Sequence, residues 1–241
     1  MLSSETEVNT PEKQPIFNLP WVITILIAGM ALIHFARTSI MSEAQNYDVI
    51  ISFAFIPIRY GNTQLLELAP YAVYWSPLTY SLLHADWAHV LMNSFWLLAF
   101  GGVTARRLET TRFLILFAVG AICGACLHYL VYSSDISPMI GASASVSACM
   151  GAAIRLPVFS EKAFIGDITK VKIRTLIEAL SNRQAITFIA VWFGVNLLFG
   201  TGIIDIAGNG NSIAWEAHIG GFVSGLVLFG FIDNLFQKRE T

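Results

Sequence analysis

Long apolar stretches separated by short polar segments run along most of this chain, and the pattern predicts helices that cross a membrane. A helix needs about 20 apolar residues to span the hydrocarbon layer of a bilayer. Six stretches approach that length, at 19–36, 87–103, 113–132, 142–156, 185–203 and 213–235. The fourth is too short to cross, so we expect it to be a buried helix that begins below the membrane surface. The prediction is an all-α membrane protein with six transmembrane helices and a short, central fourth helix.

The composition agrees with this prediction. Of the 241 residues, 55% are hydrophobic and only 12% are charged, whereas soluble domains average about 25% charged residues. The mean hydropathy is +0.64. An ordinary soluble protein is excluded, and we expect the lipid bilayer as the surroundings, with no nucleic-acid partner. The sequence leaves the oligomeric state open.

The positive charges predict how the chain threads the membrane, because cytoplasmic loops carry an excess of Lys and Arg. Of the fourteen Lys and Arg residues, only Arg37 and Arg59 fall on the side opposite to the termini. Both termini are therefore expected in the cytoplasm. Residues 1–18 form a short polar tail without the basic start of a signal peptide. Residues 19–235 form one domain, followed by a second tail at 236–241.

Two segments outside the spans have a character of their own. Residues 38–86 are rich in aromatic and aliphatic side chains but are interrupted by Pro and Gly, which predicts an outer-face loop lying in the membrane interface. Residues 157–184 form a cytoplasmic connector. Within it, four apolar residues follow the spacing i, i+3, i+4, i+7, which predicts an amphipathic helix on the surface. These residues are Ile173, Leu176, Ile177 and Leu180.

The fourth stretch includes MIGASASVSACMGAA at 139–153, which is almost entirely Gly, Ala and Ser. Small residues let helices pack closely in lipid, where close packing is a main source of helix association. Gly221 and Gly225 form a similar small face on the last span. Packing alone would explain the segment. The alternative is that one of its serines is a nucleophile.

Polar side chains gather near the outer-face ends of two other spans. His84, His89 and Asn93 open the second span, and Glu216 and His218 open the sixth. Ionisable groups inside a membrane are costly and indicate function. His89 and Asn93 are four residues apart and share a helix face, whereas His84 is out of phase and is expected to hold the loop.

These residue types suit acyl transfer. A histidine can take the proton of a serine hydroxyl and return it to the leaving group, and side-chain donors with a helix N-terminus can stabilise the oxyanion. Glu216 should face away from His218, because residues two apart on a helix point in nearly opposite directions. His34 and His128, at the ends of spans, are interpreted as interfacial residues.

Metal chemistry is not indicated by the sequence. His84 and His89 are five residues apart rather than the four of a zinc-binding H-E-x-x-H helix. Cys123 and Cys126 lie within a span and have no second pair of cysteines beside them. We predict no metal and no organic cofactor.

Three motifs together resemble those of the rhomboid intramembrane serine proteases in their basic six-helix form. GASAS resembles the nucleophile motif G-x-S-G, AHIGGFVSG resembles A-H-x-x-G-x-x-x-G on the last helix, and HADWAHVLMN resembles H-x-x-x-x-H-x-x-x-N on the second. The resemblance runs from Trp75 to Gly225 in the family's order. It implies a rhomboid-like bundle around the short fourth helix.

The resemblance also implies a role for each motif residue. Ser143 would be the nucleophile and His218 its general base, a dyad without an acid. His89, Asn93 and the backbone N–H of Ser143 would form the oxyanion hole. Supporting roles in the turn, the loop and the helix contact fall to Gly141, His84, Gly221 and Gly225.

The sequence departs from the family pattern at three positions. Ala144 replaces the usual glycine after the nucleophile, so the site must accept a methyl group there. Ser147 stands where an aromatic residue often packs on the catalytic histidine, so we expect Trp215 or a hydrogen bond to hold that ring. Ser76 replaces an arginine in the lead-in to the second span, which leaves the anchoring of the outer loop open.

The resemblance implies an intramembrane serine endopeptidase that hydrolyses peptide bonds in or next to transmembrane helices of other membrane proteins. Its partners would be transmembrane protein substrates, and its expected location is the bacterial inner (plasma) membrane. The alternative is a catalytically inactive relative that binds transmembrane helices. A transporter is disfavoured, because the chain shows no matching halves.

Overall fold

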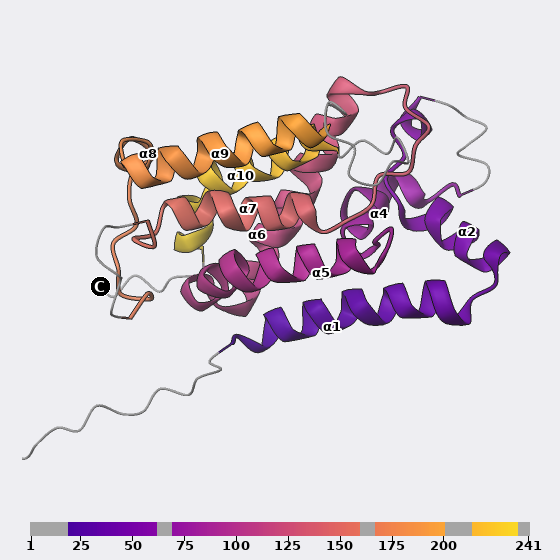
Figure 1. The fold of residues 1–241 in the computed structure, drawn as a ribbon, viewed down its shortest axis with the longest axis horizontal. Coiled ribbons are helices and arrows are strands. Elements are labelled where there is room, and N and C mark those ends of the chain that lie inside the picture. The colour runs from indigo at the N-terminus through magenta and orange to yellow at the C-terminus, as the bar shows by residue number, and fades with distance from the viewer. Residues whose placement is uncertain (1–18, 62–68, 160–166, 201–213, 236–241) are drawn as a thin grey trace, which may run out of the picture.

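The structure is a computed structural model that describes residues 19–61, 69–159, 167–200 and 214–235 (Figure 1). The predicted tails at 1–18 and 236–241 lie outside the described residues. The α-helices are α1 (Trp21–Phe35), α2 (Glu43–Phe53), α4 (Ala72–Thr79), α5 (Trp87–Trp96), α6 (Gly102–Val131), α7 (Ser143–Ile154), α8 (Leu176–Leu180), α9 (Arg183–Gly200) and α10 (Trp215–Asn234). Short 3-10 or π-helical turns are η1 (Ala36–Ile40), η2 (Pro57–Tyr60), η3 (Tyr80–Leu82) and η4 (Leu97–Gly101). The predicted all-helical class is confirmed.

Three helical runs in the described part of the chain are long and apolar enough to cross a membrane. They are Trp21–Ile40, Trp87–Val131 and Trp215–Asn234. Two shorter apolar helices accompany them, at Ser143–Ile154 and Arg183–Leu198. Together with the apolar composition, these helices make the chain an integral membrane protein.

The run Trp87–Val131 contains the second and third predicted spans. We expected a polar loop between them, at about residues 104–112, but helical geometry continues through most of that segment. The break is confined to Glu109, whose φ of 60° and ψ of 176° are not helical. A positive φ is uncommon for a residue other than glycine. A glutamate at this position is therefore no local signal for a break in the helix.

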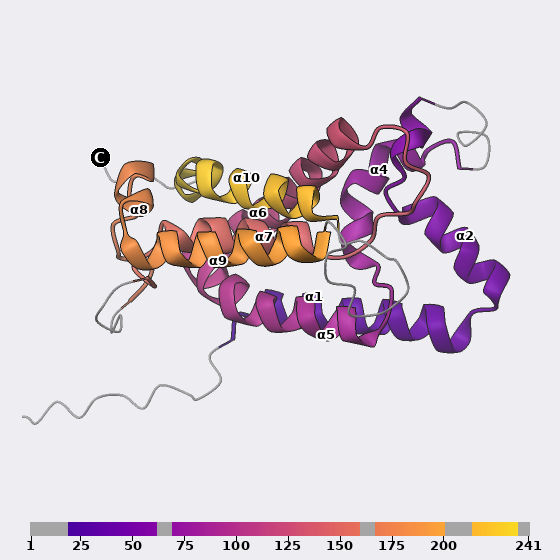
Figure 2. The same ribbon diagram turned by 45° about the horizontal axis from the view of Figure 1, so that its top comes forward.

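Helix α7 lies at the centre of the bundle, packed against α6 and α10 (Figures 1 and 2). Eleven of its twelve residues are buried, the exception being Ser143 at its start. Gly221 and Gly225 of α10 face this helix so closely that an added Cβ would lie 2.0 Å from the carbonyl oxygens of Ala144 and Ala148, respectively. Small residues on both helices thus permit backbone contact.

Helices α1 and α9 lie on opposite sides of this central group (Figure 1). Helix α9 runs alongside α10 (Figure 2). Aromatic rings make part of that contact: Trp192 of α9 stacks on Phe222 of α10 with ring centroids 4.7 Å apart. This stacking fixes one turn of α9 against the first half of α10.

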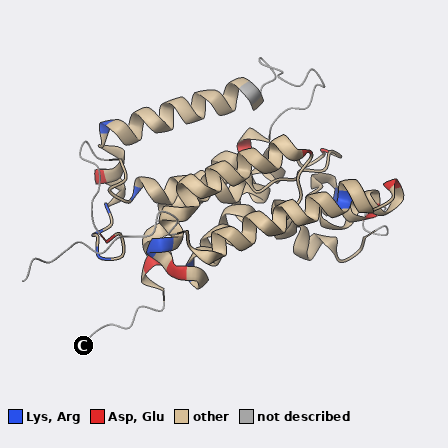
Figure 3. Ribbon diagram, turned by 60° about the horizontal axis from the view of Figure 1, so that its bottom comes forward, with Lys and Arg blue, Asp and Glu red and all other residues tan. Residues whose placement is uncertain are grey.

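Lys and Arg residues are concentrated at one end of the helices (Figure 3). There Arg107 forms a two-pronged ion pair with Asp233, with N–O distances of 2.8 and 2.7 Å, and donates to the carbonyl of Val171 at 2.9 Å. Arg155 at the end of α7 donates to the carbonyl of Leu226 at 2.9 Å. These arginines tie the ends of α6, α7 and α10 to the connector.

The segment 38–86 is folded into helices and turns where it is described, and residues 62–68 lie outside the description. Arg37 and Arg59, the two positive charges counted on the side opposite to the termini, are both buried. Arg59 donates to the carbonyls of Ala54 and Ile51. Arg59 is therefore an internal anchor of the loop.

The outer-face segment 38–86 is also held by hydrogen bonds around position 76, where serine replaces the arginine of the family pattern. Ser76 is buried, and its hydroxyl lies 3.3 Å from the hydroxyl of Tyr60. Trp75 donates from Nε1 to the carbonyl of Ser52 at 2.8 Å, and Thr79 donates to the carbonyl of Phe53 at 2.9 Å. The outer loop is therefore anchored without an arginine at position 76.

The predicted amphipathic helix of the connector is wrong in extent. Within the predicted stripe, residues 173–180, helix is confined to Leu176–Leu180, so Ile173 lies before it, and Ile177 is 79% exposed. The reason is a capping box: Thr175 accepts from the N–H of Glu178, and the Glu178 carboxylate accepts from the N–H of Thr175. This motif fixes the helix start at residue 176. Residues 160–166 of the connector lie outside the described residues.

Candidate active site

Ser143 is the first residue of α7, and the turn before it has an unusual backbone. Gly141 has a φ of 125°, a region that side chains disfavour. Its N–H donates to the carbonyl of Tyr80 at 3.0 Å. The turn leaves Ser143 as the residue of α7 that is not fully buried. Its hydroxyl therefore stands at a helix N-terminus, where negative charge is stabilised.

The Ser143 hydroxyl lies beside a histidine from another helix. Its Oγ is 2.7 Å from Nε2 of His218. His218 belongs to the first turn of α10. It can come this close because Gly221, one turn further along, lets α10 touch the backbone of Ala144. The small faces of the two helices thus bring together the hydroxyl and the imidazole.

Sequence reasoning missed a third member of this arrangement, Asn196 of α9. Its Oδ1 lies 2.5 Å from Nδ1 of His218, and the side chain is buried. A single Asn within an apolar helix carries no spacing motif. The available signal was the cost of placing a polar side chain in a membrane helix.

His89 lies against the turn that precedes the serine. A Cβ added at Gly141 would be 2.7 Å from both Cε1 and Nε2 of this ring. On the other side of the ring, Nδ1 is 3.5 Å from the backbone nitrogen of Ala85, a long contact in which the N–H points at the ring. An acceptor at Nδ1 leaves the proton on Nε2. The His89 N–H then faces the region next to Gly141 and Ser143.

Asn93 and His84 have more clearly structural contacts. Asn93 is buried on α5 and donates from Nδ2 to the carbonyl of His89 at 3.1 Å. The structure thus places Asn93 one turn beyond His89, with one of its two amide N–H groups bonded to the His89 carbonyl. His84 is fully buried, and its ring is 4.9 Å from that of His89 in an edge-on arrangement.

The backbone of His84 is bound by side chains of α1 and the following turn η1. Its carbonyl accepts from Nη1 of Arg37 at 2.9 Å and lies 3.2 Å from Nδ1 of His34. Burial lowers the pKa of the His84 ring. Its neutral Nε2 is 3.5 Å from the backbone nitrogen of Ala142. His84 therefore links α1 to the turn before Ser143.

Two histidines were wrongly interpreted as interfacial. His34 is 1% exposed and contacts the His84 carbonyl and the ring of Trp87. His128 is buried on α6 and forms a close ion pair or hydrogen bond with the buried carboxylate of Glu216 on α10. Both were misassigned because their partners are far apart in sequence. Glu216 was expected to face away from His218, and its contact with His128 agrees with that expectation.

The departures from the motif are accommodated by neighbouring residues. A Cβ at Gly124 of α6 would be 2.5 Å from Cβ of Ala144, so the glycine supplies the room that the methyl group needs. Ser147 donates its hydroxyl to the carbonyl of Ser143 at 2.7 Å. Trp215 lies against Gly200 of α9. The hydrogen bond that His218 Nδ1 donates to Oδ1 of Asn196 holds the ring without an aromatic residue at 147.

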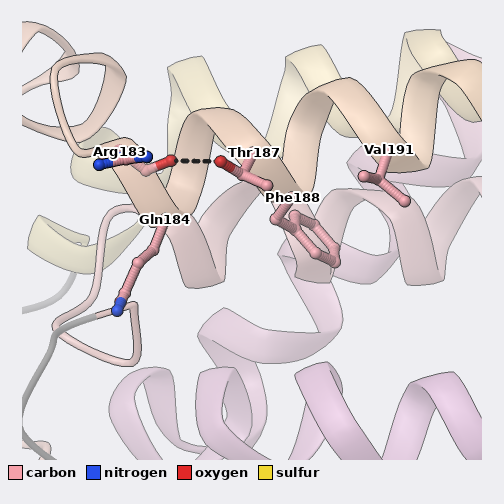
Figure 4. Close-up of a pocket in the computed structure, with 5 residues that line it drawn as sticks. All are labelled: Arg183, Gln184, Thr187, Phe188 and Val191. Atoms are coloured by element: carbon pink, nitrogen blue, oxygen red, sulfur yellow. Dashed lines mark hydrogen bonds between the residues drawn. The ribbon is translucent and has the colours of Figure 1, made fainter.

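A pocket on α9 lies elsewhere. It is lined by Arg183, Gln184, Thr187, Phe188 and Val191, all on the first half of that helix (Figure 4). None of the predicted site residues is among them. The pocket therefore adds nothing to the chemistry around Ser143.

The fold and the site define a helical membrane protein in which a serine at the start of a buried helix meets a histidine from a neighbouring helix. A family model for the Rhomboid domain matches residues 71–233. This match covers α4 to most of α10 and all the motif residues. The chain belongs to the rhomboid family.

Two bacterial relatives are similar over much of the chain. Rhomboid protease GluP of Bacillus subtilis (strain 168) is 24% identical over 202 residues, which cover 84% of this chain and 33% of that protein. The chain thus spans about a third of the length of GluP. Rhomboid protease GlpG of Haemophilus influenzae is 27% identical over 167 residues, which cover 69% of this chain and 73% of that protein.

Proposed function

We propose that this protein is an intramembrane serine endopeptidase, which hydrolyses peptide bonds in or next to the transmembrane helices of other membrane proteins. The observation that carries the proposal is the distance of 2.7 Å between Oγ of Ser143 and Nε2 of His218. A serine hydroxyl and an imidazole at this distance form the pair that acyl transfer needs. Membership of the rhomboid family supports the same reaction class.

In the proposed mechanism, Nε2 of His218 takes the proton of the Ser143 hydroxyl while Oγ attacks the carbonyl carbon of the scissile peptide bond. The tetrahedral intermediate carries its negative charge on the former carbonyl oxygen. His218 then gives its proton to the leaving amine, and an acyl-enzyme remains on Ser143. A water molecule, deprotonated by His218, hydrolyses that ester and restores the hydroxyl.

The oxyanion would be stabilised by groups at the start of α7. The backbone N–H of Ser143 belongs to the open first turn of that helix, where N–H groups lack intrahelical acceptors. The contact of His89 with Gly141 supports a second donor, the N–H on Nε2. Asn93 is proposed as a third donor, through the second N–H of its amide, while the first donates to the carbonyl of His89.

The membrane topology follows from the same reasoning. We infer six spans, with α7 as the short fourth span that starts within the bilayer, and both termini in the cytoplasm. The clustering of Lys and Arg at one end of the helices supports this orientation (Figure 3). A location in the bacterial inner membrane is supported by the bacterial origin of the two relatives.

The second candidate is an inactive relative that binds transmembrane helices. It would not need a serine and a histidine at hydrogen-bond distance, and the presence of both argues against it. The two functions are separated by a cleavage assay on a generic single-span substrate reconstituted in liposomes. We expect cleavage by the wild type and none by Ser143→Ala. Binding without cleavage by the wild type would favour the inactive relative.

A further inference from the structure

Asn196 is a polar side chain on the apolar helix α9, and its burial needs an explanation. The side chain is 8% exposed, and an unpaired amide in such surroundings costs free energy. Both ends of the amide are paired. Nδ2 donates to the carbonyl of Trp192 at 2.8 Å, and Oδ1 faces Nδ1 of His218 at 2.5 Å.

We propose that Asn196 is a positioning residue that fixes the tautomer and the orientation of His218, an inference that rests on the proposed protease function. The Asn196 amide is bonded to Trp192 and to His218. It acts through the imidazole. The motifs shared with the rhomboid family do not include this residue.

The hydrogen-bond directions carry the argument. Because Nδ2 of Asn196 is the donor to Trp192, the atom facing His218 is the carbonyl oxygen Oδ1, which can only accept. Nδ1 of His218 must then carry the proton. In the neutral ring Nε2 is left with a lone pair, and that lone pair faces Oγ of Ser143 at 2.7 Å. Asn196 thus selects the tautomer that can act as a base.

The packing of α9 on α10 supports the position of the amide. Trp192 stacks on Phe222, and Asn196 meets His218. On α9, Asn196 follows Trp192 by four residues. On α10, its partner His218 precedes Phe222 by four residues. The two contacts are therefore neighbouring rungs of one antiparallel helix pair. Trp192 thus takes part in both contacts: its ring stacks on Phe222, and its carbonyl orients the Asn196 amide.

Asn196 also holds the His218 ring in place of the aromatic residue that this chain lacks at position 147. Ser147 takes the place of an aromatic residue beside the histidine, and its hydroxyl is bonded to the backbone of its own helix. Among the described residues, Asn196 is the side chain bonded to Nδ1 of His218. Removing Oδ1 would leave the ring free to rotate or to change tautomer.

The test compares Asn196→Leu, which has a similar size but no acceptor, with Asn196→Asp, which keeps an acceptor at the same place. Thr187→Val is the matched control, since the Thr187 hydroxyl donates to the carbonyl of Arg183 at 2.9 Å, another bond between a side chain and the preceding turn of α9 (Figure 4). For each protein, kcat, KM, the pH profile of kcat and the melting temperature in detergent are measured on a single-span substrate.

We expect Asn196→Leu to lower kcat by about 10²-fold with little change in KM, the scale of loss for a misplaced catalytic group. Thr187→Val should match the wild type. Asn196→Asp should retain most of the turnover and move the acid limb of the kcat profile to higher pH, because a carboxylate stabilises the imidazolium. His89, the other titratable ring at the site, is unchanged in all three variants.

Three results would overturn the inference. They are wild-type kcat in Asn196→Leu, an unshifted acid limb in Asn196→Asp, and a loss of kcat in Asn196→Leu that Thr187→Val reproduces. If Asn196→Leu does not fold, the Asp variant decides alone. A wild type that neither cleaves the substrate nor reacts with a fluorophosphonate at Ser143 would overturn the proposed function, and the inference with it. A wild type that cleaves while Asn196→Leu cleaves equally well overturns only the inference.

Discussion

The backbone of Gly221 touches the backbone of Ala144, because a Cβ at position 221 would lie 2.0 Å from the Ala144 carbonyl oxygen. One turn before this contact on α10 is His218, and one residue before Ala144 is Ser143. The distance between the hydroxyl and the imidazole is therefore set by a contact between two backbones. Any side chain at position 221 would push the two helices apart.

The first prediction concerns this contact. Gly221→Ala should lower the free energy of unfolding by about 1–3 kcal/mol or more, because the added methyl group overlaps a backbone atom that cannot yield without moving the helix. It should also lower kcat, since separation by about an ångström can cost about 10²-fold. Melting in detergent and cleavage of a single-span substrate measure the two effects.

Gly29→Ala is the matched control for that substitution. Gly29 lies on α1, and nothing is within 4 Å of a Cβ added there. Alanine favours helix by about 1 kcal/mol over glycine, so this variant should melt no lower than the wild type and keep its turnover. Equal behaviour of the two variants would show that α10 does not depend on the contact at Gly221.

The second prediction separates the reacting groups from the scaffold. Ser143→Ala and His218→Ala should each abolish cleavage. Ser143→Ala should leave the melting temperature close to that of the wild type, whereas His218→Ala also leaves the buried Oδ1 of Asn196 without its partner and should cost about 1–3 kcal/mol of unfolding free energy. A fluorophosphonate should label the wild type at Ser143, as located by peptide mass spectrometry. Labelling that persists in Ser143→Ala at Ser145 or Ser147 would contradict the assignment of the nucleophile.

The third prediction concerns the oxyanion. His89→Ala should lower kcat by up to about 10²–10³-fold with little change in KM, the loss measured when one oxyanion donor is removed. Asn93→Ala should act in the same way, because the second N–H of its amide can donate to the oxyanion while the first donates to the His89 carbonyl. Steady-state kinetics of both variants measure the two losses, and wild-type kcat in Asn93→Ala would remove Asn93 from the oxyanion hole. Inhibition of the wild type by a chelator would instead favour a metal role for the histidines.

The sequence predicts those parts of the helix bundle and the site that depend on nearby residues or on a regular spacing of residues. The small residues of 139–153 and the glycines of the last span indicate close helix packing, and the structure brings their backbones together. The resemblance of the motifs to those of the rhomboid family implied that Ser143 and His218 would meet, and the structure has them at 2.7 Å. Their catalytic roles stay predictions.

The remaining features depend on contacts between segments that are distant in sequence. Asn196 is 22 residues from His218, with no periodic pattern joining them. Arg59 bonds to backbone carbonyls, which leave no trace in side-chain patterns. Glu109 adopts a positive φ, which a glutamate does not predict. The start of α8 is different, because the Thr175 and Glu178 capping box was readable and was overlooked in favour of the apolar stripe.

The last prediction concerns the buried pair of Glu216 and His128, which lies close in sequence to the proposed base. Glu216 is 2% exposed, and its carboxylate is bonded to Nδ1 of His128 on α6. The pair joins the first turn of α10 to the last turns of α6. Its removal should therefore affect stability rather than chemistry.

Glu216→Leu removes one member of the pair and leaves a buried imidazole nitrogen without its partner, which should cost about 1–3 kcal/mol of unfolding free energy. The double variant Glu216→Leu/His128→Leu removes both polar groups and should recover part of that loss, because no group is then left unpaired. In each variant, kcat per folded molecule, with the folded fraction taken from far-UV circular dichroism, should stay within a few-fold of the wild type. A loss of kcat comparable to that of His218→Ala, with unchanged melting, would make Glu216 part of the catalytic machinery.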